Sequence, residues 1–226
     1  MRSAHFILNN MTIFNKLFAA IGFTLGALAF TPSAYAQEAP DALVKRISQE
    51  VVDAAKTDKD IQRGNQKRVL ELVEEKILPH VDFQRMTALA AGRFWREATP
   101  EQQKQLTNEF RSLLVFTYSG AISQIKDQKV EFRPLRADPT DTEVEVRSQV
   151  VQPRGGDPIQ LNYRLAKEQT GWKIYDVNVL GAWLVETYKG NFASEISKGG
   201  IDGLIKTLSE KNKRLAASAN KGAKAS

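Results

Sequence analysis

Cysteine is absent from this 226-residue sequence, and its absence removes several kinds of chemistry. Without a thiol there is no disulfide, no thiolate metal ligand, no cysteine nucleophile and no CxxC redox pair. Histidine is almost as scarce: His80 is the only one beyond the first 36 residues, and no second histidine stands near it to complete a metal site. The P-loop and GxGxxG patterns that bind nucleotides are also missing. The sequence therefore predicts no metal site and little that favours an enzyme.

Long apolar runs are missing except near the N-terminus. From Met11 onward, Lys16 supplies a positive charge, Leu17–Phe30 is apolar, and Ala34-Tyr35-Ala36 has the small-residue pattern of a cleavage site. The fourteen apolar residues are too few to span a bilayer comfortably, although a retained N-terminal anchor is the alternative. We expect residues 1–36 to be a signal peptide that is cleaved after Ala36, so that the mature protein is exported.

An excess of one charge is absent from the body of the chain. The formal charge is +6, of which two positive residues lie in the expected signal peptide and five lie in residues 211–226, so residues 37–210 carry −1. A nucleic-acid binder gathers Lys and Arg on a folded face, so we expect no nucleic-acid partner. Residues 211–226 contain no acid and are rich in Ala, Lys and Asn, which predicts a basic disordered tail. Such a tail could touch anionic membranes or merely keep the chain soluble.

The remaining chain is one domain in length, and its first half has helical periodicity. Removing 36 of the 226 residues leaves 190, enough for a sizeable core. Thr99 can cap a long helix in which Pro100 takes the first position and Gln102 completes a capping box. The expected helices are Asp41–Asp58, Asp60–Ile77, a third that Asp82 caps, and the helix from Pro100.

The second half changes to a strand pattern. Four β-rich runs are separated by short turn signals: Lys129–Pro134, Thr142–Val151, Ile159–Lys167 and Gly171–Val179. Short connections predict an antiparallel meander, and the alternation from Ile159 to Leu165 predicts one buried and one wet face. Helical pattern returns over 182–208, interrupted at Gly199-Gly200. The fold class expected for residues 37–210 is therefore α+β, with helices packed on a four-stranded antiparallel sheet.

Two groups of residues allow more than one interpretation. Asp176 lies between Tyr175 and Val177 on an expected strand, where a structural hydrogen bond is favoured over acid–base catalysis. The many aromatic residues fit an aromatic core, but some of them could line an open apolar cavity. Periodicity does not separate these two, because a side chain facing a lipid tail and one facing a leucine look alike in sequence.

Two blocks of the sequence resemble the MlaC family of toluene-tolerance auxiliary proteins. The first block comprises Leu78-Pro79, Asp82-Phe83, Gly92-Arg93, Trp95, the Ala98–Gln102 run, Phe110-Arg111 and Tyr118. The second block comprises Gly171-Trp172-Lys173, Tyr175-Asp176-Val177, Gly181 and Lys198–Leu204. The chain departs from the family pattern at Leu180 and Trp183, a region that we expect to border a cavity or its mouth.

The resemblance implies a fold and a function. The fold is an NTF2-like cone in which a curved sheet and helices enclose an apolar cavity. The function is that of a periplasmic phospholipid carrier that maintains lipid asymmetry, needs no cofactor and holds phospholipid as cargo. The implied partners are an inner-membrane ABC transporter with an MCE-domain ring, an outer-membrane lipoprotein–porin complex, and a transient membrane contact.

The expected lining of the cavity combines helix and strand residues that face one apolar side. They are Phe83, Met86, Leu114, Tyr118, Ile122, Phe132, Val144, Val146, Leu161, Tyr163, Leu165, Trp172, Ile174, Val179 and Trp183. Two alternatives to the carrier remain open. One is a periplasmic adaptor with a dry core and no ligand, and the other is an enzyme that acts on an apolar substrate with Asp176 or His80 as base.

Overall fold

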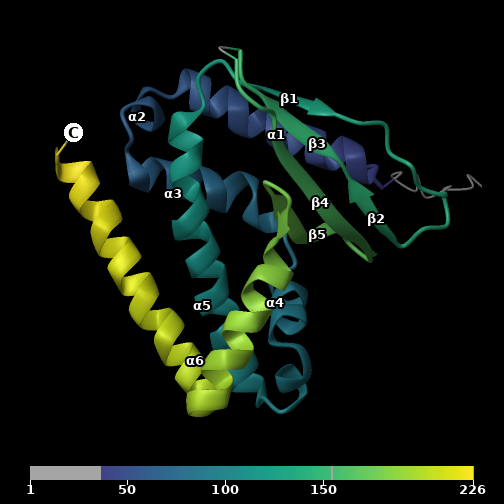
Figure 1. Ribbon diagram of the computed structural model, residues 1–226. Coiled ribbons are helices and arrows are strands. Elements are labelled where there is room, and N and C mark those ends of the chain that lie inside the picture. The colour runs from purple at the N-terminus through teal and green to yellow at the C-terminus, as the bar shows by residue number, and fades with distance from the viewer. Residues whose placement is uncertain (1–36, 154, 226) are drawn as a thin grey trace, which may run out of the picture. The chain divides into compact units, whose positions relative to one another are not determined.

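The computed structural model describes residues 37–153 and 155–225, so the expected signal peptide lies outside the described residues. The α+β architecture is confirmed (Figure 1). The helices are α1 (Pro40–Thr57), α2 (Lys59–Gln62), α3 (Gln66–Lys76), α4 (Phe83–Ala91), α5 (Pro100–Tyr118) and α6 (Leu184–Ala225), with 3-10 turns η2 (Leu78–His80), η3 (Gly92–Arg96) and η4 (Ser119–Gln124). The strands are β1 (Lys129–Phe132), β2 (Glu143–Val146), β3 (Ser148–Val151), β4 (Ile159–Glu168), β5 (Gly171–Val179) and β6 (Ala182–Trp183).

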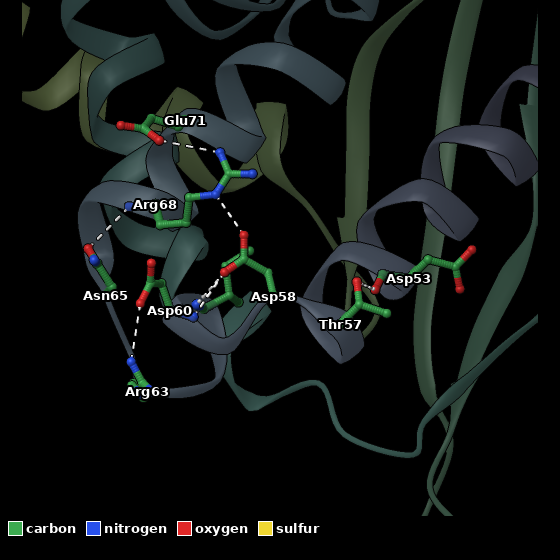
Figure 2. A network of polar contacts seen from close by, with 9 residues as sticks. Asp53, Thr57, Asp58, Asp60, Arg63, Asn65, Arg68 and Glu71 are labelled. Atoms are coloured by element: carbon green, nitrogen blue, oxygen red, sulfur yellow. Dashed lines mark hydrogen bonds and ion pairs between the residues drawn. The ribbon is translucent and has the colours of Figure 1, made fainter.

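A polar network divides the expected second helix into α2 and α3 (Figure 2). The Asp58 carboxylate accepts from the backbone N–H groups of Asp60 and Ile61 and so caps α2. The same carboxylate accepts from Arg68 Nε at 2.7 Å, which fastens α3 to the start of α2. Asn65 then caps α3 by accepting from the N–H of Arg68. Two caps within seven residues turn the chain back on itself, where periodicity alone predicts one continuous helix.

The start of α5 is as the sequence predicts. The Thr99 hydroxyl accepts from the N–H of Gln102 at 3.2 Å, and the Thr99 N–H donates to Gln102 Oε1 at 3.0 Å. This reciprocal pair provides acceptors for two backbone N–H groups that the start of the helix would otherwise leave without a hydrogen bond. Asp82 caps α4 in a similar way, accepting from the N–H of Arg85 at 2.9 Å.

The sheet has six antiparallel strands where the sequence suggests four. Its order is β1-β3-β4-β5-β6, and β2 pairs with the other end of β4. The expected run Thr142–Val151 is split because the Ser148 N–H donates to the side chain of Asn162 at 3.1 Å instead of to a strand carbonyl. At the far edge, Leu180 and Gly181 have φ of 54° and 88°, which forms the tight turn from β5 into β6.

The core comprises two apolar clusters. The sheet-side cluster joins α1, α2, α3 and η4 to the sheet around Leu43, Val69, Leu165 and Ile174. The helix-side cluster joins α4, α5 and α6 around Met86, Phe110, Phe192 and Leu204. Val81 and Val177 pack against both clusters. These two valines therefore mark where the sheet layer meets the helical layer.

The C-terminal segment differs from the disordered tail that the sequence suggests. Helix α6 bends at Gly199 and at Gly200, which has φ of 66°, and its second arm runs back toward α3 (Figure 1). Asn212 is 6% exposed and its Nδ2 donates to the backbone and side chain of Glu109 on α5. Leu215 packs against the helix-side cluster. Composition suggested disorder because it ignores this packing against α5, from which most helical stability comes.

Within residues 37–153 and 155–225, no helix combines the length and the apolar character that crossing a bilayer requires.

Candidate functional site

The candidate site is built on one face of the sheet. Antiparallel register places apolar side chains in three rows across β2, β4 and β5: Val144–Leu165–Ile174, Val146–Tyr163–Val177, and Leu161–Val179. We call these eight residues the inner face. Alternate residues point the other way, so Glu145, Arg164 and Asp176 form a polar row on the outer face.

Most residues predicted to line a cavity fall into the two clusters. The sheet-side cluster includes or contacts eight of them: Ile122, Phe132, Val144, Val146, Tyr163, Leu165, Trp172 and Ile174. The helix-side cluster includes or contacts four: Phe83, Met86, Leu114 and Val179. The structure thus brings sheet and helix residues from distant parts of the chain into two adjacent groups rather than one.

Three predicted residues lie apart from these groups. Leu161 is half-buried at the end of the inner face and packs with neither cluster in the described part of the chain. Tyr118, at the end of α5, is 37% exposed and reaches the edge of the helix-side cluster through a hydrogen bond with Tyr188. Trp183 pairs with Asn178 and lies under the Arg164 guanidinium, whose central carbon is 3.8 Å from the ring centroid. Trp183 is therefore on the outer face with Arg164.

Tyr163 is the central residue of the middle row, and the pKa of its hydroxyl is shifted by its surroundings. Burial raises the pKa of its hydroxyl to about 12, although hydrogen bonds to Ser48 and Ser148 act in the opposite direction. Yet the side chain is not sealed, because it keeps an intermediate share of its accessible surface. Tyr163 is therefore a partly exposed residue that packs against the sheet-side cluster.

An aromatic group connects α5 to the first arm of α6. The ring of Phe110 meets Tyr188 and Phe192 edge to face, with centroids 4.9 and 5.0 Å apart. Burial and the nearby Tyr118 raise the pKa of Tyr188 to about 12. Aromatic pairs in this geometry contribute beyond their buried area, so they hold the α5–α6 wall of the helix-side cluster.

Asp176 has a structural position. One carboxylate oxygen accepts from the N–H groups of Val177 and Val185 at 2.9 and 3.0 Å, and the other lies 3.4 Å from an Arg164 nitrogen. Burial raises the pKa of this carboxyl, and the hydrogen bonds and Arg164 oppose the rise. Since Val185 is in the first turn of α6, Asp176 fixes where α6 leaves the sheet.

His80, the other candidate base, is half-buried in the η2 turn. Burial lowers its pKa, and the positive charges of Arg46 and Lys173 act in the same direction. Among the described residues, no hydrogen bond joins His80 to Asp176. The hydrogen bonds there also include no pair that resembles a nucleophile and its base.

Val177 and Val81 are the residues of the site that the sequence-based lining omitted. Val177 faces inward because it is the register partner of Tyr163. Alternation counted back from Val179 identifies Val177, whereas alternation counted from Ile174 does not, because the β4–β5 register shifts between Arg164 and Leu165. Val81 joins the site through a single parallel bridge to Ile174, a contact that no local pattern encodes.

Two surface hollows lie away from the inner face. One is a shallow area on α3 around Leu70, bordered by Lys67, Glu71, Glu74 and Glu75. The other has a volume of about 550 Å³ and is lined by Arg133, Pro134, Arg136, Glu145 and Arg147. Neither includes a residue that the sequence predicted for the site.

The family model of the MlaC protein matches residues 45–210. Among curated proteins, the chain is 22% identical over 203 residues to the "Intermembrane phospholipid transport system binding protein MlaC" of Haemophilus influenzae, which covers 89% of this chain and 95% of that protein. It is 24% identical over 181 residues to the "Toluene tolerance protein ttg2D" of Pseudomonas putida, covering 80% and 83% respectively.

A solved structure shows the same fold with a ligand. It is the phospholipid-binding protein from Ralstonia solanacearum in complex with a phospholipid. The two chains share 47% sequence identity and superpose with a TM-score of 0.74, over 78% of this chain and 98% of the other.

Proposed function

This chain belongs to the MlaC family, and from that membership we propose that it is a periplasmic carrier that shuttles glycerophospholipids between the outer and inner membranes. The observation that carries the proposal is the phospholipid held by the Ralstonia relative, because 47% identity over nearly all of that chain implies a shared fold and a similar interior. The Haemophilus influenzae relative, which is named for intermembrane phospholipid transport, supports the same proposed function.

In this proposal the acyl chains lie along the inner face, between the two clusters. Val144, Tyr163 and Val177 on this face are only half-buried, so part of the face is accessible to a ligand. The two clusters are in contact through Val81 and Val177, so a modest separation at these side chains widens the space. The inner face carries no charged side chain, which suits an aliphatic ligand and leaves the headgroup in water.

The energetics are adequate for a carrier. Each buried methylene contributes ~0.8 kcal/mol, so one long acyl chain offers on the order of 10 kcal/mol before the costs of association. This binding needs no specific headgroup contact. The protein can therefore hold its cargo firmly in water and still release it where a partner offers a competing apolar environment.

The proposed partners follow from the family. They are an inner-membrane ABC transporter with an MCE-domain ring and an outer-membrane lipoprotein–porin complex, with transient contact to the membrane itself. The proposed location is the periplasm, reached by cleavage of residues 1–36.

Organic extraction of protein purified from the periplasm, followed by lipid mass spectrometry, tests the function. We expect intact phospholipid and a protein mass that corresponds to a chain beginning at Gln37. An adaptor with a dry core would give no lipid, and an enzyme would convert the bound lipid on incubation. A mature protein that keeps Leu17–Phe30 would contradict the proposed export.

A further inference from the structure

The hollow of about 550 Å³ is formed where three short segments meet on the outer side of the sheet. Arg133, Pro134 and Arg136 come from the start of the connection between β1 and β2, which extends as a wide loop beside the sheet (Figure 1). Glu145 comes from β2, and Arg147 is the residue between β2 and β3. The Arg133 N–H donates to the Arg147 carbonyl at 3.0 Å, so the backbone holds these two arginines side by side.

The hollow has an unbalanced positive charge. Three guanidinium groups line it against one carboxylate, a surplus of two positive charges. Glu145 accepts from Arg147 Nε at 2.8 Å, which leaves the two terminal nitrogens of Arg147 open. In the part of the chain that the structure describes, Arg133 and Arg136 have no ion-pair partner.

The acidic residues of the neighbouring loop are engaged elsewhere. Asp138 accepts from the N–H and hydroxyl of Thr140, and Asp141 accepts from the N–H of Asp138. These bonds close a turn within the loop, and neither carboxylate lines the hollow. The guanidinium groups that line the hollow repel one another, and the single Glu145 carboxylate offsets only part of this repulsion.

We propose that this hollow binds the phosphate of an anionic phospholipid headgroup and so docks the protein on a bilayer surface. Guanidinium groups bind phosphate oxygens through paired N–H donors, and three of them from two directions can surround one phosphate. Basic residues at an anionic bilayer surface each contribute to binding, and the contribution falls with salt. The ligand chemistry is thus a phosphate group, and its source is a membrane lipid.

The position of the hollow connects docking to the cargo site. Phe132 precedes Arg133, Leu135 precedes Arg136, and Val144 and Val146 flank Glu145. All four of these apolar residues belong to or contact the sheet-side cluster. Because side chains alternate along β2, Glu145 faces outward where Val144 and Val146 face the interior. A protein docked here holds its cargo site one strand layer from the bilayer. This benefit rests on the proposed function, whereas the binding of phosphate does not.

Vesicle co-sedimentation of the mature full chain tests the proposal. The vesicles are phosphatidylcholine alone, or phosphatidylcholine with phosphatidylglycerol. The test variant is Arg133→Gln/Arg136→Gln/Arg147→Gln. The matched control is Arg63→Gln/Arg93→Gln/Arg96→Gln, which removes three exposed arginines outside the hollow and the same charge. All six side chains are exposed, so both variants should unfold at the wild-type temperature.

We expect the wild type to bind the anionic vesicles and to release them at high salt. The hollow variant should lose about tenfold or more of this binding, and the control less than about twofold. Equal losses in the two variants would show a general charge effect and overturn the proposal. Absence of vesicle binding by the wild type would also overturn it and would point to an acidic protein as the occupant.

A titration with inorganic phosphate distinguishes the source of the ligand. NMR signals of the arginine side chains should shift in the wild type, and phosphate should compete with vesicles. Phosphate binding without vesicle binding would assign the hollow to a free ion and overturn docking. Lipid content is measured on the same samples, and we expect the hollow variant to retain its cargo. If the wild type contains no lipid and still docks on the vesicles, the carrier function is rejected and the docking role of the hollow is kept.

Discussion

Asp176 shows how a single carboxylate sets the geometry around the inner face. Its side chain is 1% exposed and accepts the N–H groups of Val177 and Val185. Replacing it with alanine leaves the buried Val185 N–H without its acceptor, which typically costs ~1–3 kcal/mol. We therefore expect Asp176→Ala to lower the free energy of unfolding by about that amount in urea titrations. A stability equal to wild type would contradict the structural role.

The pH dependence of Asp176 has a definite sign. Burial raises its folded-state pKa above the unfolded value, so the folded protein binds more protons between the two. This group's contribution to stability is complete below the ordinary aspartate pKa of ~3.9 and declines as pH rises through the raised value. Asp176→Asn removes the titration. The stability of wild type relative to this variant should therefore fall with rising pH in that window, and a constant difference would contradict the shift.

Leu180 has a backbone conformation that leucine disfavours. Its φ is 54° in the two-residue turn between β5 and β6, and its side chain is 71% exposed. A left-handed conformation costs such a residue roughly 1–2 kcal/mol, whereas Asn-Gly suits this turn. We expect Leu180→Asn to raise the free energy of unfolding by about 0.5–1 kcal/mol.

The control for this variant is Leu89→Asn. Leu89 is also exposed, at 41%, but it lies inside α4, where asparagine is a weaker helix former. This substitution should destabilise the protein. If both leucine variants shift stability in the same direction, the turn conformation of Leu180 is not responsible.

At the scale of elements, the sequence predicts features that neighbouring residues encode and not those that depend on distant residues. The capping box of α5 is encoded by Thr99 and Gln102 within four residues, so the sequence alone predicts it. The break between β2 and β3 depends on Asn162, fourteen residues from Ser148. The division of α2 from α3 depends on the caps Asp58 and Asn65 and on Arg68 reaching Asp58 across ten residues. Periodicity contains no information on such pairs.

The second arm of α6 gives a prediction for the segment expected to be disordered. Leu215 packs against the helix-side cluster, while its neighbour Arg214 is exposed. A fully buried leucine loses 2–5 kcal/mol on truncation to alanine, so the half-buried Leu215 should lose about 1–2 kcal/mol. Arg214→Ala should be near neutral. Thermal unfolding of both variants tests whether this arm is packed. A disordered tail would give the two variants the same unfolding temperature.

At the scale of the whole molecule, the residue types of the candidate site are more predictable than their grouping. Alternation placed Leu161, Tyr163 and Leu165 on one face, as the register shows. It could not show that Trp183 turns outward onto Arg164, because that depends on the β5–β6 turn. Nor could it show two clusters in place of one, since cluster membership is decided by how distant helices pack.

The central claim is that acyl chains occupy the space along the inner face. Val177 is the residue to enlarge, because it is half-buried and touches both clusters. The matched control is Gln160→Trp, on the exposed side of β4. Asn162 is unsuitable as a control because its side chain accepts from the Ser148 N–H.

Native mass spectrometry of the wild type, Val177→Trp and Gln160→Trp, each purified from the periplasm, tests this claim most directly. An indole that fills the space displaces acyl chain, whereas overpacking a solid core costs ~1–3 kcal/mol of stability without touching a ligand. We expect one phospholipid mass on the wild type and on Gln160→Trp, and a marked loss of that mass from a still cooperatively folding Val177→Trp. Equal lipid occupancy in all three proteins, or no lipid on the wild type, would contradict the account.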